Sequence, residues 1–332
     1  MSNYRIFGSE LSPYSVKVRS YFRYKGLPHE WIPRSPAVQA EFQKYAKLPL
    51  VPLVVTPEGE GVQDSTPILE RLEASRPEPS IVPDDATLAF ISALLEEYGD
   101  EWGNKWMFHY RWRYQADAWS TAERIAQQMM GAQGTLAVAQ ARAAVAERMM
   151  GRLGFVGSND RTQPAIEASF KRTLAFLEAH LQTRPYMLGG RPAMADFGLW
   201  GQFYEAATDP TPGAIMRASS PKVMAWVQRM VSPKSEGPFE AWAALASTLM
   251  PLLKDEVGAL FLPWTVANAA VIERGDKSFE MTLGGASWSQ EPQKYHARAL
   301  AEIRRKYAAA KGAPGLETIL KESGCLPYLT SP

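Results

Sequence analysis

Ser12 lies where a short apolar run gives way to a helical pattern, and it is the first residue placed to do chemistry. Residues 4–7 alternate like a short strand, and from Tyr14 onward apolar residues recur every three or four positions. Pro13 suits the first position of a helix, where a missing N–H costs little. A helix N-terminus presents free N–H groups and partial positive charge, so a hydroxyl there can help to hold an anion such as a thiolate. Ser12 could equally be only an N-cap.

Two later stretches also carry residues with special backbone roles. Residues 50–55 are apolar and β-branched, which is typical of a buried strand. Pro52 cannot donate to a sheet ladder, so it is expected at the strand's beginning or at a special turn, and a cis Val51–Pro52 bond is one solution. Asp64 and Ser65 stand at a predicted helix start, where either could be the N-cap.

These stretches must be positioned by a small domain. Over residues 1–80 the pattern predicts the order strand, helix, strand, helix, strand, strand, helix. A β-α-β unit followed by a hairpin and a helix forms a small mixed sheet with helices around it. We therefore expect an α/β domain at the N-terminus.

The order and spacing of these motifs resemble the thioredoxin-like N-terminal domain of the glutathione transferase superfamily. The turn at residues 12–15, Ser-Pro-Tyr-Ser, is similar to the Cys-Pro-Tyr-Cys turn of glutaredoxins, with oxygen in place of both sulfurs. It resembles serine-type transferases in its first residue and omega-like transferases in its placement before proline. Val51-Pro52 resembles the family's cis-proline turn, and Asp64-Ser65 resembles the acid–serine pair that begins the third helix.

The resemblance implies glutathione as cosubstrate, with no metal. Ser12 would donate a hydrogen bond to the glutathione thiolate and would not be a covalent nucleophile; Tyr14 and Ser15 are the alternative donors. Because this turn has no cysteine, disulfide exchange through a mixed disulfide cannot run there. The only cysteine, Cys325, is remote in sequence.

The resemblance also implies how the rest of glutathione would be held. Ser65 would bind the α-carboxylate through its N–H and hydroxyl, and Asp64 would bind the α-ammonium, directly or across a dimer interface. The backbone of Val51 would pair with the cysteinyl unit as an added strand. Many members have lysine or glutamine where this chain has Leu50, so Lys47 is the candidate here for the glycyl carboxylate.

Three further regions follow the first domain. We expect a linker at residues 81–84, an all-helical domain over 85–235 that resembles the family's C-terminal bundle, and a mostly helical extension over 236–332. Asp196 is expected to cap a buried helix by reaching back to a backbone N–H, although Ala193 stands where the family has serine or threonine.

The first long helix of the second domain carries a stripe of aromatic residues. In the family this helix borders both the dimer interface and the electrophile pocket. The stripe is too wide for one core face, which predicts that part of it meets the other domain or a bound apolar group. The candidates for the pocket are Trp102, Trp106, Phe108 and Tyr110.

The extension is long for this superfamily. A hairpin is predicted over residues 278–289 with Gly284-Gly285 as its turn, followed by an amphipathic helix over 295–310. One hypothesis is that the extension folds over the cleft and narrows the electrophile pocket.

Composition limits the remaining choices. The 332 residues include 36 Lys+Arg and 35 Asp+Glu, and this balance argues against nucleic acid as the main partner. No signal-peptide or membrane-spanning pattern is found, so we expect a cytoplasmic protein, and the family implies a homodimer. The leading interpretation is a glutathione transferase of detoxification, which activates the glutathione thiolate for attack on a small apolar electrophile. The alternatives are a non-catalytic binding or interaction protein and a glutathione-dependent peroxidase or isomerase.

Overall fold

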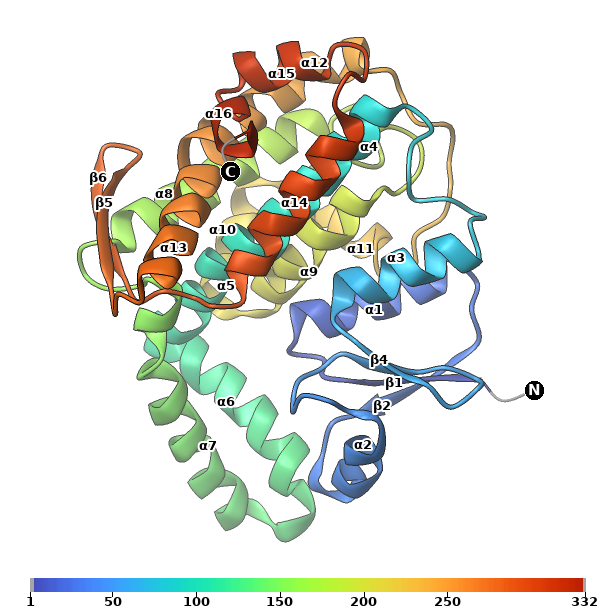
Figure 1. Ribbon diagram of the computed structural model, residues 1–332. Helices are drawn as coiled ribbons and strands as arrows, with labels where there is room; N and C mark the ends of the chain where they lie inside the picture. The colour runs from blue at the N-terminus through green and yellow to red at the C-terminus, as the bar shows by residue number, and fades with distance from the viewer. Residues whose placement is uncertain (1–2, 331–332) are drawn as a thin grey trace.

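A four-stranded mixed sheet forms the N-terminal domain of the computed structural model, which describes residues 3–330 (Figure 1). The strand order is β2-β1-β3-β4, with β1 parallel to β2 and antiparallel to β3. The elements of this domain are β1 (Tyr4–Gly8), α1 (Pro13–Tyr24), β2 (His29–Pro33), a 3₁₀ turn (Pro36–Val38), α2 (Gln39–Tyr45), β3 (Leu53–Val55), β4 (Gly61–Gln63) and α3 (Ser65–Ser75). The predicted order of elements is confirmed.

A continuous helical rod opens the second domain. It consists of α4 (Ala86–Glu97), a π-helical segment (Tyr98–Gly103) and α5 (Asn104–Arg113). The remaining elements are α6 (Gln115–Met130), α7 (Thr135–Met150), α8 (Gln163–His180), α9 (Met194–Thr208), α10 (Pro210–Ser219), α11 (Pro221–Arg229) and two 3₁₀ turns (Gly131–Gln133 and Leu153–Val156). The hairpin of α6 and α7 projects alongside the N-terminal domain, where Gln128 Nε2 donates to the Arg34 carbonyl at 2.9 Å (Figure 1).

The buried helix α9 begins as predicted. The Asp196 carboxylate accepts from the backbone N–H of Ala193 at 2.9 Å, which is the reach-back half of a capping box. It also accepts from the Met187 N–H at 3.0 Å and from Trp226 Nε1 at 2.9 Å. Burial raises the pKa of Asp196 to about 7, and these donors oppose the shift. Asp196 is therefore a structural cap.

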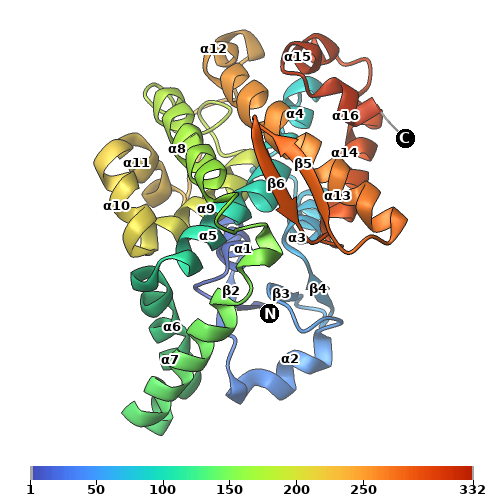
Figure 2. The ribbon, with the colours of Figure 1, turned by 90° about the vertical axis from the view of Figure 1, so that its left-hand side faces the viewer.

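The extension packs on the rod rather than forming a separate unit. It contains α12 (Trp242–Leu252), a π-helical segment (Leu253–Phe261), α13 (Leu262–Arg274), β5 (Phe279–Leu283), β6 (Ala286–Gln290), α14 (His296–Ala310), α15 (Leu316–Glu322) and α16 (Leu326–Thr330). The predicted hairpin is present, with Gly284 and Gly285 at φ of 57° and 81° in its turn, and it packs on α13 (Figure 2). Helix α14 lies along α4 (Figure 1).

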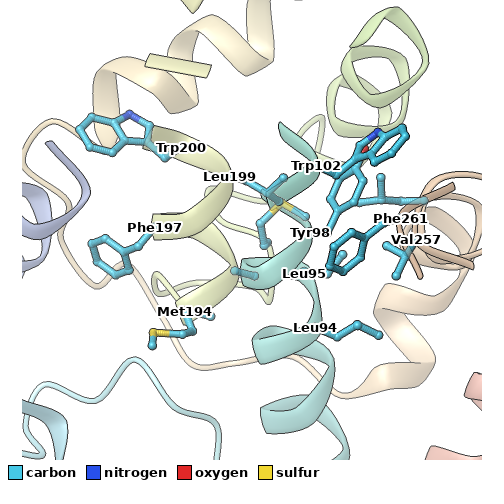
Figure 3. Close-up of a cluster of buried hydrophobic side chains, with 14 of the residues drawn as sticks. Leu94, Leu95, Tyr98, Trp102, Met194, Phe197, Leu199, Trp200, Val257 and Phe261 are labelled. Atoms are coloured by element: carbon cyan, nitrogen blue, oxygen red, sulfur yellow. The ribbon is translucent and has the colours of Figure 1, made fainter. Parts of the chain in front are cut away.

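One hydrophobic core joins the second domain to the extension. Val257 and Phe261 of the extension face Leu95 and Tyr98 of the rod (Figure 3), and the rings of Tyr98 and Phe261 are 6.1 Å apart. All four side chains are buried. The predicted fold class, a thioredoxin-like α/β domain followed by a helical domain with an additional C-terminal segment, is confirmed. Among residues 3–330, no helix is long and apolar enough to cross a bilayer.

Candidate functional site

The sheet register brings the three predicted stretches to one edge. Phe7 pairs with Leu53, and Leu53 pairs with Gln63, so these residues form a row across β1, β3 and β4. The next residues outward from this row are Gly8, Pro52 and Asp64. Neighbouring strands lie about 4.8 Å apart, so the chain segments leaving the three strands emerge side by side. The loop from Gly8 then leads directly to the start of α1.

Ser12 is the N-cap of α1. Its φ of −112° and ψ of 113° are extended, and its Oγ accepts from the Ser15 backbone N–H at 3.3 Å. This is the bonding of an N-cap, and it uses the acceptor side of the hydroxyl. The O–H hydrogen stays available to an acceptor, because the side chain is only partly buried.

The two alternative donors are less available. The Tyr14 hydroxyl donates to the Asp100 carbonyl at 3.0 Å, and burial together with the charges of Glu101 and Asp100 raises the pKa of Tyr14 well above its usual range. The Ser15 side chain is fully buried, and its Oγ has no hydrogen-bond partner within residues 3–330. Ser12 is therefore the hydroxyl of the turn that is both accessible and unengaged as a donor.

The Val51–Pro52 bond is cis, in agreement with the prediction. The loop before it is fixed by Gln63, a residue that the sequence analysis did not single out. Gln63 Oε1 accepts from the Lys47 and Leu48 N–H groups at 2.7 and 2.9 Å. Gln63 Nε2 donates to the Leu48 and Leu50 carbonyls at 2.8 Å each. The end of β4 thus holds residues 47–50 through one side chain.

Asp64 and Ser65 stand at the N-terminus of α3. Asp64 has a φ of 79°, a conformation that aspartate tolerates better than most residues, and its side chain makes no capping bond. Its carboxylate instead accepts a hydrogen bond from the hydroxyl of Tyr295 in the extension. Ser65 is buried as the first residue of α3. The predicted anion-binding and ammonium-binding positions are therefore adjacent, and the extension reaches the second one.

Lys47 is exposed and is part of this loop, and a second cation that sequence reasoning missed lies beside the loop. Arg34 stacks on the Phe42 ring at 3.8 Å and lies 3.4 Å from the Pro49 carbonyl, to which it donates. Leu50, which stands where the family often has a polar residue, is 57% exposed. Lys47 and Arg34 are thus the cations that flank the outer end of this edge.

A buried ionic cluster lies beneath the turn. Lys17, one helical turn after Tyr14, donates to Asp100 Oδ2 at 2.6 Å, to Thr66 Oγ1 at 3.2 Å and to the Glu96 carboxylate. Burial raises the pKa of Asp100 to about 8, while Lys17 opposes the shift. The cluster connects α1 and α3 with α4 and the π-helical segment. A π-helical turn at this position fits a candidate site, because such turns are frequent at functional sites.

Arg111 anchors the Ser12 turn to the helical domain. Its guanidinium is buried, contacts Asp209 at 2.6 Å and Glu205 at 2.7 Å, and donates to the Leu11 carbonyl at 3.0 Å. Close packing supports the same junction, because a Cβ at Gly201 of α9 would lie 2.6 Å from the Pro13 carbonyl oxygen. The ion-paired Arg111 thereby positions Leu11, the residue before Ser12.

Three of the four residues predicted to line the electrophile pocket are buried in the core, and the fourth, Phe108, is half-buried. Trp102, Trp106 and Tyr110 are at most 2% exposed. Trp106 packs 4.8 Å from the Phe203 ring, and Phe108 belongs to a small cluster around Trp112. The width of the stripe has a different cause from the one predicted. The extension covers one side of it, with the Trp288 ring 5.5 Å from that of Trp102.

A surface cavity of about 280 Å³ lies away from this edge. It is lined by Tyr4, Val54, Thr56 and Arg71, among others. Thr56 lies in the β3–β4 turn, at the opposite end of these strands from Pro52. The cavity is therefore separate from the candidate site.

A small sheet domain with a cis-proline turn, followed by a helical domain, defines a glutathione transferase architecture. Family models of the glutathione S-transferase N-terminal and C-terminal domains match residues 6–80 and 135–229. The chain belongs to the glutathione S-transferase superfamily.

Several solved structures are similar to the chain. A glutathione S-transferase from Methylobacterium radiotolerans, in complex with glutathione sulfonate, is 20% identical over 72% of this chain and 97% of its own, with a TM-score of 0.42. One from Rhodospirillum rubrum F11 is 15% identical over 73% and 98%, with a TM-score of 0.45. The beta-etherase LigF from Sphingobium sp. strain SYK-6 is 18% identical over 75% and 99%, also with a TM-score of 0.45. No curated protein sequence matches the chain.

Proposed function

We propose that the protein is a glutathione transferase that binds glutathione at the sheet edge and activates its thiol with Ser12. The observation that carries the proposal is the register, in which Gly8, Pro52 and Asp64 follow the same row of paired residues. A thiol-activating turn, a backbone edge and a helix N-terminus are thereby neighbours. These are the three elements needed to hold the thiol, the peptide and the amino-acid end of glutathione.

Each part of glutathione then has a partner. The Ser65 N–H and hydroxyl bind the α-carboxylate, and Asp64 binds the α-ammonium. The backbone of Val51 pairs with the cysteinyl unit, and Lys47, with Arg34 as the alternative cation, takes the glycyl carboxylate. In the reaction, the thiol proton leaves to solvent and the thiolate forms a carbon–sulfur bond. The displaced electron pair departs with the leaving group or stays on the electrophile after addition.

The energetics of thiol activation are within reach of this turn. An unperturbed thiol has a pKa of about 8.5, and lowering it by about two units needs roughly 2.7 kcal/mol. A hydrogen bond to a charged acceptor contributes about 1.5–3 kcal/mol. A helix N-terminus adds up to about 2 kcal/mol. Ser12 and α1 together are therefore sufficient.

The test is the titration of bound glutathione, followed by the ultraviolet absorbance of its thiolate. In Ser12→Ala, we expect the pKa of the bound thiol to rise by about one to two units because one charge-assisted hydrogen bond is lost. Ser15→Ala and Tyr14→Phe are matched controls and should titrate like the wild type. An unchanged titration in Ser12→Ala would contradict the assignment, and a shift in one control would transfer the role to that residue.

A second candidate is a non-catalytic binding protein of the same superfamily. The contact of Tyr295 with Asp64 favours it, because a side chain of the extension already touches the position proposed for the ammonium. Turnover of a model electrophile separates the two, since only the enzyme produces conjugate in proportion to the amount of protein.

The proposal includes a homodimeric, cytoplasmic enzyme of detoxification. Because α14 packs along α4, the dimer contact must lie outside the part of α4 that the extension covers. Sedimentation velocity tests the dimer directly, and a monomer at micromolar concentration would contradict it.

A further inference from the structure

Tyr295 is the residue of the extension that enters the candidate site. It lies immediately before α14, and its hydroxyl donates to Oδ2 of Asp64, 231 positions earlier in the chain. The side chain is 48% exposed, so it lies at the mouth of the site rather than in the core. Residue 295 falls outside both regions that the family models match.

Buried anchors on both sides hold Tyr295 in place. On one side, Gln293 exchanges two hydrogen bonds with Asn268, N–H to Oδ1 at 2.7 Å and Nδ2 to carbonyl at 2.9 Å. On the other side, His296 contacts the Glu101 carboxylate and packs edge-on against Trp264 with ring centroids 5.0 Å apart. Because both of its neighbours are anchored in this way, Tyr295 is held in a defined position. Its contact with Asp64 therefore follows from the packing of the extension.

The contact leaves Asp64 able to bind a ligand. A carboxylate has two oxygens and about four lone-pair sites, so a hydroxyl on Oδ2 leaves Oδ1 free for an ammonium. Partial burial, the hydrogen bond to Asp64 and the nearby Glu101 raise the pKa of Tyr295, so its phenol stays a donor at neutral pH. Since the Asp64 side chain makes no capping bond, this hydroxyl fixes its rotation.

We propose that Tyr295 is a positioning residue of the glutathione site, which orients the Asp64 carboxylate toward the α-ammonium and so selects ligands with a free α-amino group. This inference rests on the proposed function. It assigns a share in recognising the cosubstrate to the extension, which lies outside the two matched domains.

The experiment compares two ligands by calorimetry on the full-length protein. One is glutathione, and the other is glutaryl-cysteinyl-glycine, which lacks only the α-amino group. In Tyr295→Phe, we expect glutathione to bind about three- to tenfold more weakly, because an oriented charge-assisted contact is lost, while the binding of the des-amino ligand is unchanged. In the Asp64→Asn background, Tyr295→Phe should have no further effect. Tyr328→Phe, in α16 of the same extension, is the matched control and should bind both ligands like the wild type.

Each other outcome overturns a specific statement. If Tyr295→Phe binds glutathione as tightly as the wild type or more tightly, the hydroxyl does not position Asp64. Tighter binding would mean that the Tyr295 hydroxyl competes with the α-ammonium for Asp64. If Tyr295→Phe binds both ligands more weakly by the same factor, the Tyr295 hydroxyl acts on a part of the ligand other than the α-amino group. Thermal melting of each variant verifies that the fold is retained. If the wild type binds neither ligand, the proposed function itself fails; if only the Tyr295→Phe effect is missing, this inference fails alone.

Discussion

The sheet edge and the extension contribute to the same site by different means. At the sheet edge, neighbouring strands and short loops place Pro52 and Asp64, so most of the geometry follows from local pairing. The extension delivers Tyr295 through a buried core and a chain of side-chain contacts with partners 25 to 231 positions away. Under the proposed function, the first region defines which ligand class fits, and the second adjusts how one end of that ligand is held. Changes in the two regions should accordingly have different kinds of effect.

The largest effect is expected from removing the extension. Its buried apolar side chains include Leu245, Leu249, Leu252, Val257 and Phe261. Full burial of such a side chain is worth about 1.5–3 kcal/mol, and their sum rivals the roughly 5–15 kcal/mol that stabilises an ordinary domain. A chain that ends at residue 235 should lose cooperative thermal unfolding by circular dichroism. A truncated chain that melts cooperatively within a few degrees of the full chain would show the extension to be an appendage.

A large effect is also expected at the junction between the two domains. Arg111→Met leaves the buried Glu205 without its cation and leaves Asp209 with Arg124 alone, and breaking a buried pair in this way costs about 3–5 kcal/mol. Urea unfolding measures this loss. The matched control is Arg113→Met on the same helix, whose ion pair with Asp160 is exposed and should cost less than about 1 kcal/mol. If both variants lose the same free energy of unfolding, Arg111 does not anchor the junction.

A smaller, pH-dependent effect tests how the extension is coupled to the second domain. His180 of α8 contacts Thr248 Oγ1 of α12 at 2.7 Å and the Met187 carbonyl at 2.9 Å. Burial, helped by nearby Arg184, lowers the pKa of His180 to about 4 from its usual value of about 6.5. Between these values the unfolded chain binds the proton and the folded chain does not, so stability is lost as the pH falls.

The corresponding measurement is urea unfolding at pH 7 and at pH 4. This histidine should account for roughly 3 kcal/mol of the difference between the two pH values. His180→Gln should reduce the difference by about that amount. If the variant keeps the full pH dependence of the wild type, His180 is not the group that titrates.

The smallest effect is expected at the sheet edge itself. Gln63→Ala removes four hydrogen bonds to the loop at residues 47–50, all of them solvent-exposed, so stability should fall by only about 1 kcal/mol. The affinity for glutathione should fall more clearly, because this loop carries Lys47 and leads into Val51. Gln182→Ala, which changes an exposed glutamine in the turn after α8, far from the sheet edge in sequence, is the control. A loss of stability without a loss of affinity would separate this loop from the site.

Much of the sheet domain was predictable because its signals are local. Pro13 after Ser12 and Pro52 inside an apolar run each restrict the local backbone. In the extension, Gly284-Gly285 permits the positive φ values of a tight turn between two strands. The pattern of such residues predicted the strands and the hairpin. The cis bond was one of the solutions that Pro52 left open, and the family resemblance implied it. Gln63 was missed because its role depends on which loop folds back beside β4, and no local pattern encodes that contact.

The second half of the site could not be predicted for the same reason. The stripe of Trp102 and Trp106 indicated an apolar face but did not say what covers it, and the covering element proved to be the chain's own extension. The hypothesis that the extension folds over the site agrees with the contact of Tyr295 and Asp64. A narrowed electrophile pocket remains a prediction. Tyr295 has no sequence signal, because its position is set by Asn268, Gln293 and His296 together.

The most direct test of the central claim is calorimetry of the wild-type protein with glutathione. The account predicts saturable binding of one glutathione per chain, with a dissociation constant between micromolar and low millimolar, and release of protons as the thiol ionises above its new pKa. Ser65→Ala should weaken this binding, because the α-carboxylate loses a hydroxyl donor at the N-terminus of α3. A folded wild-type protein that takes up no glutathione at millimolar concentrations would contradict the account.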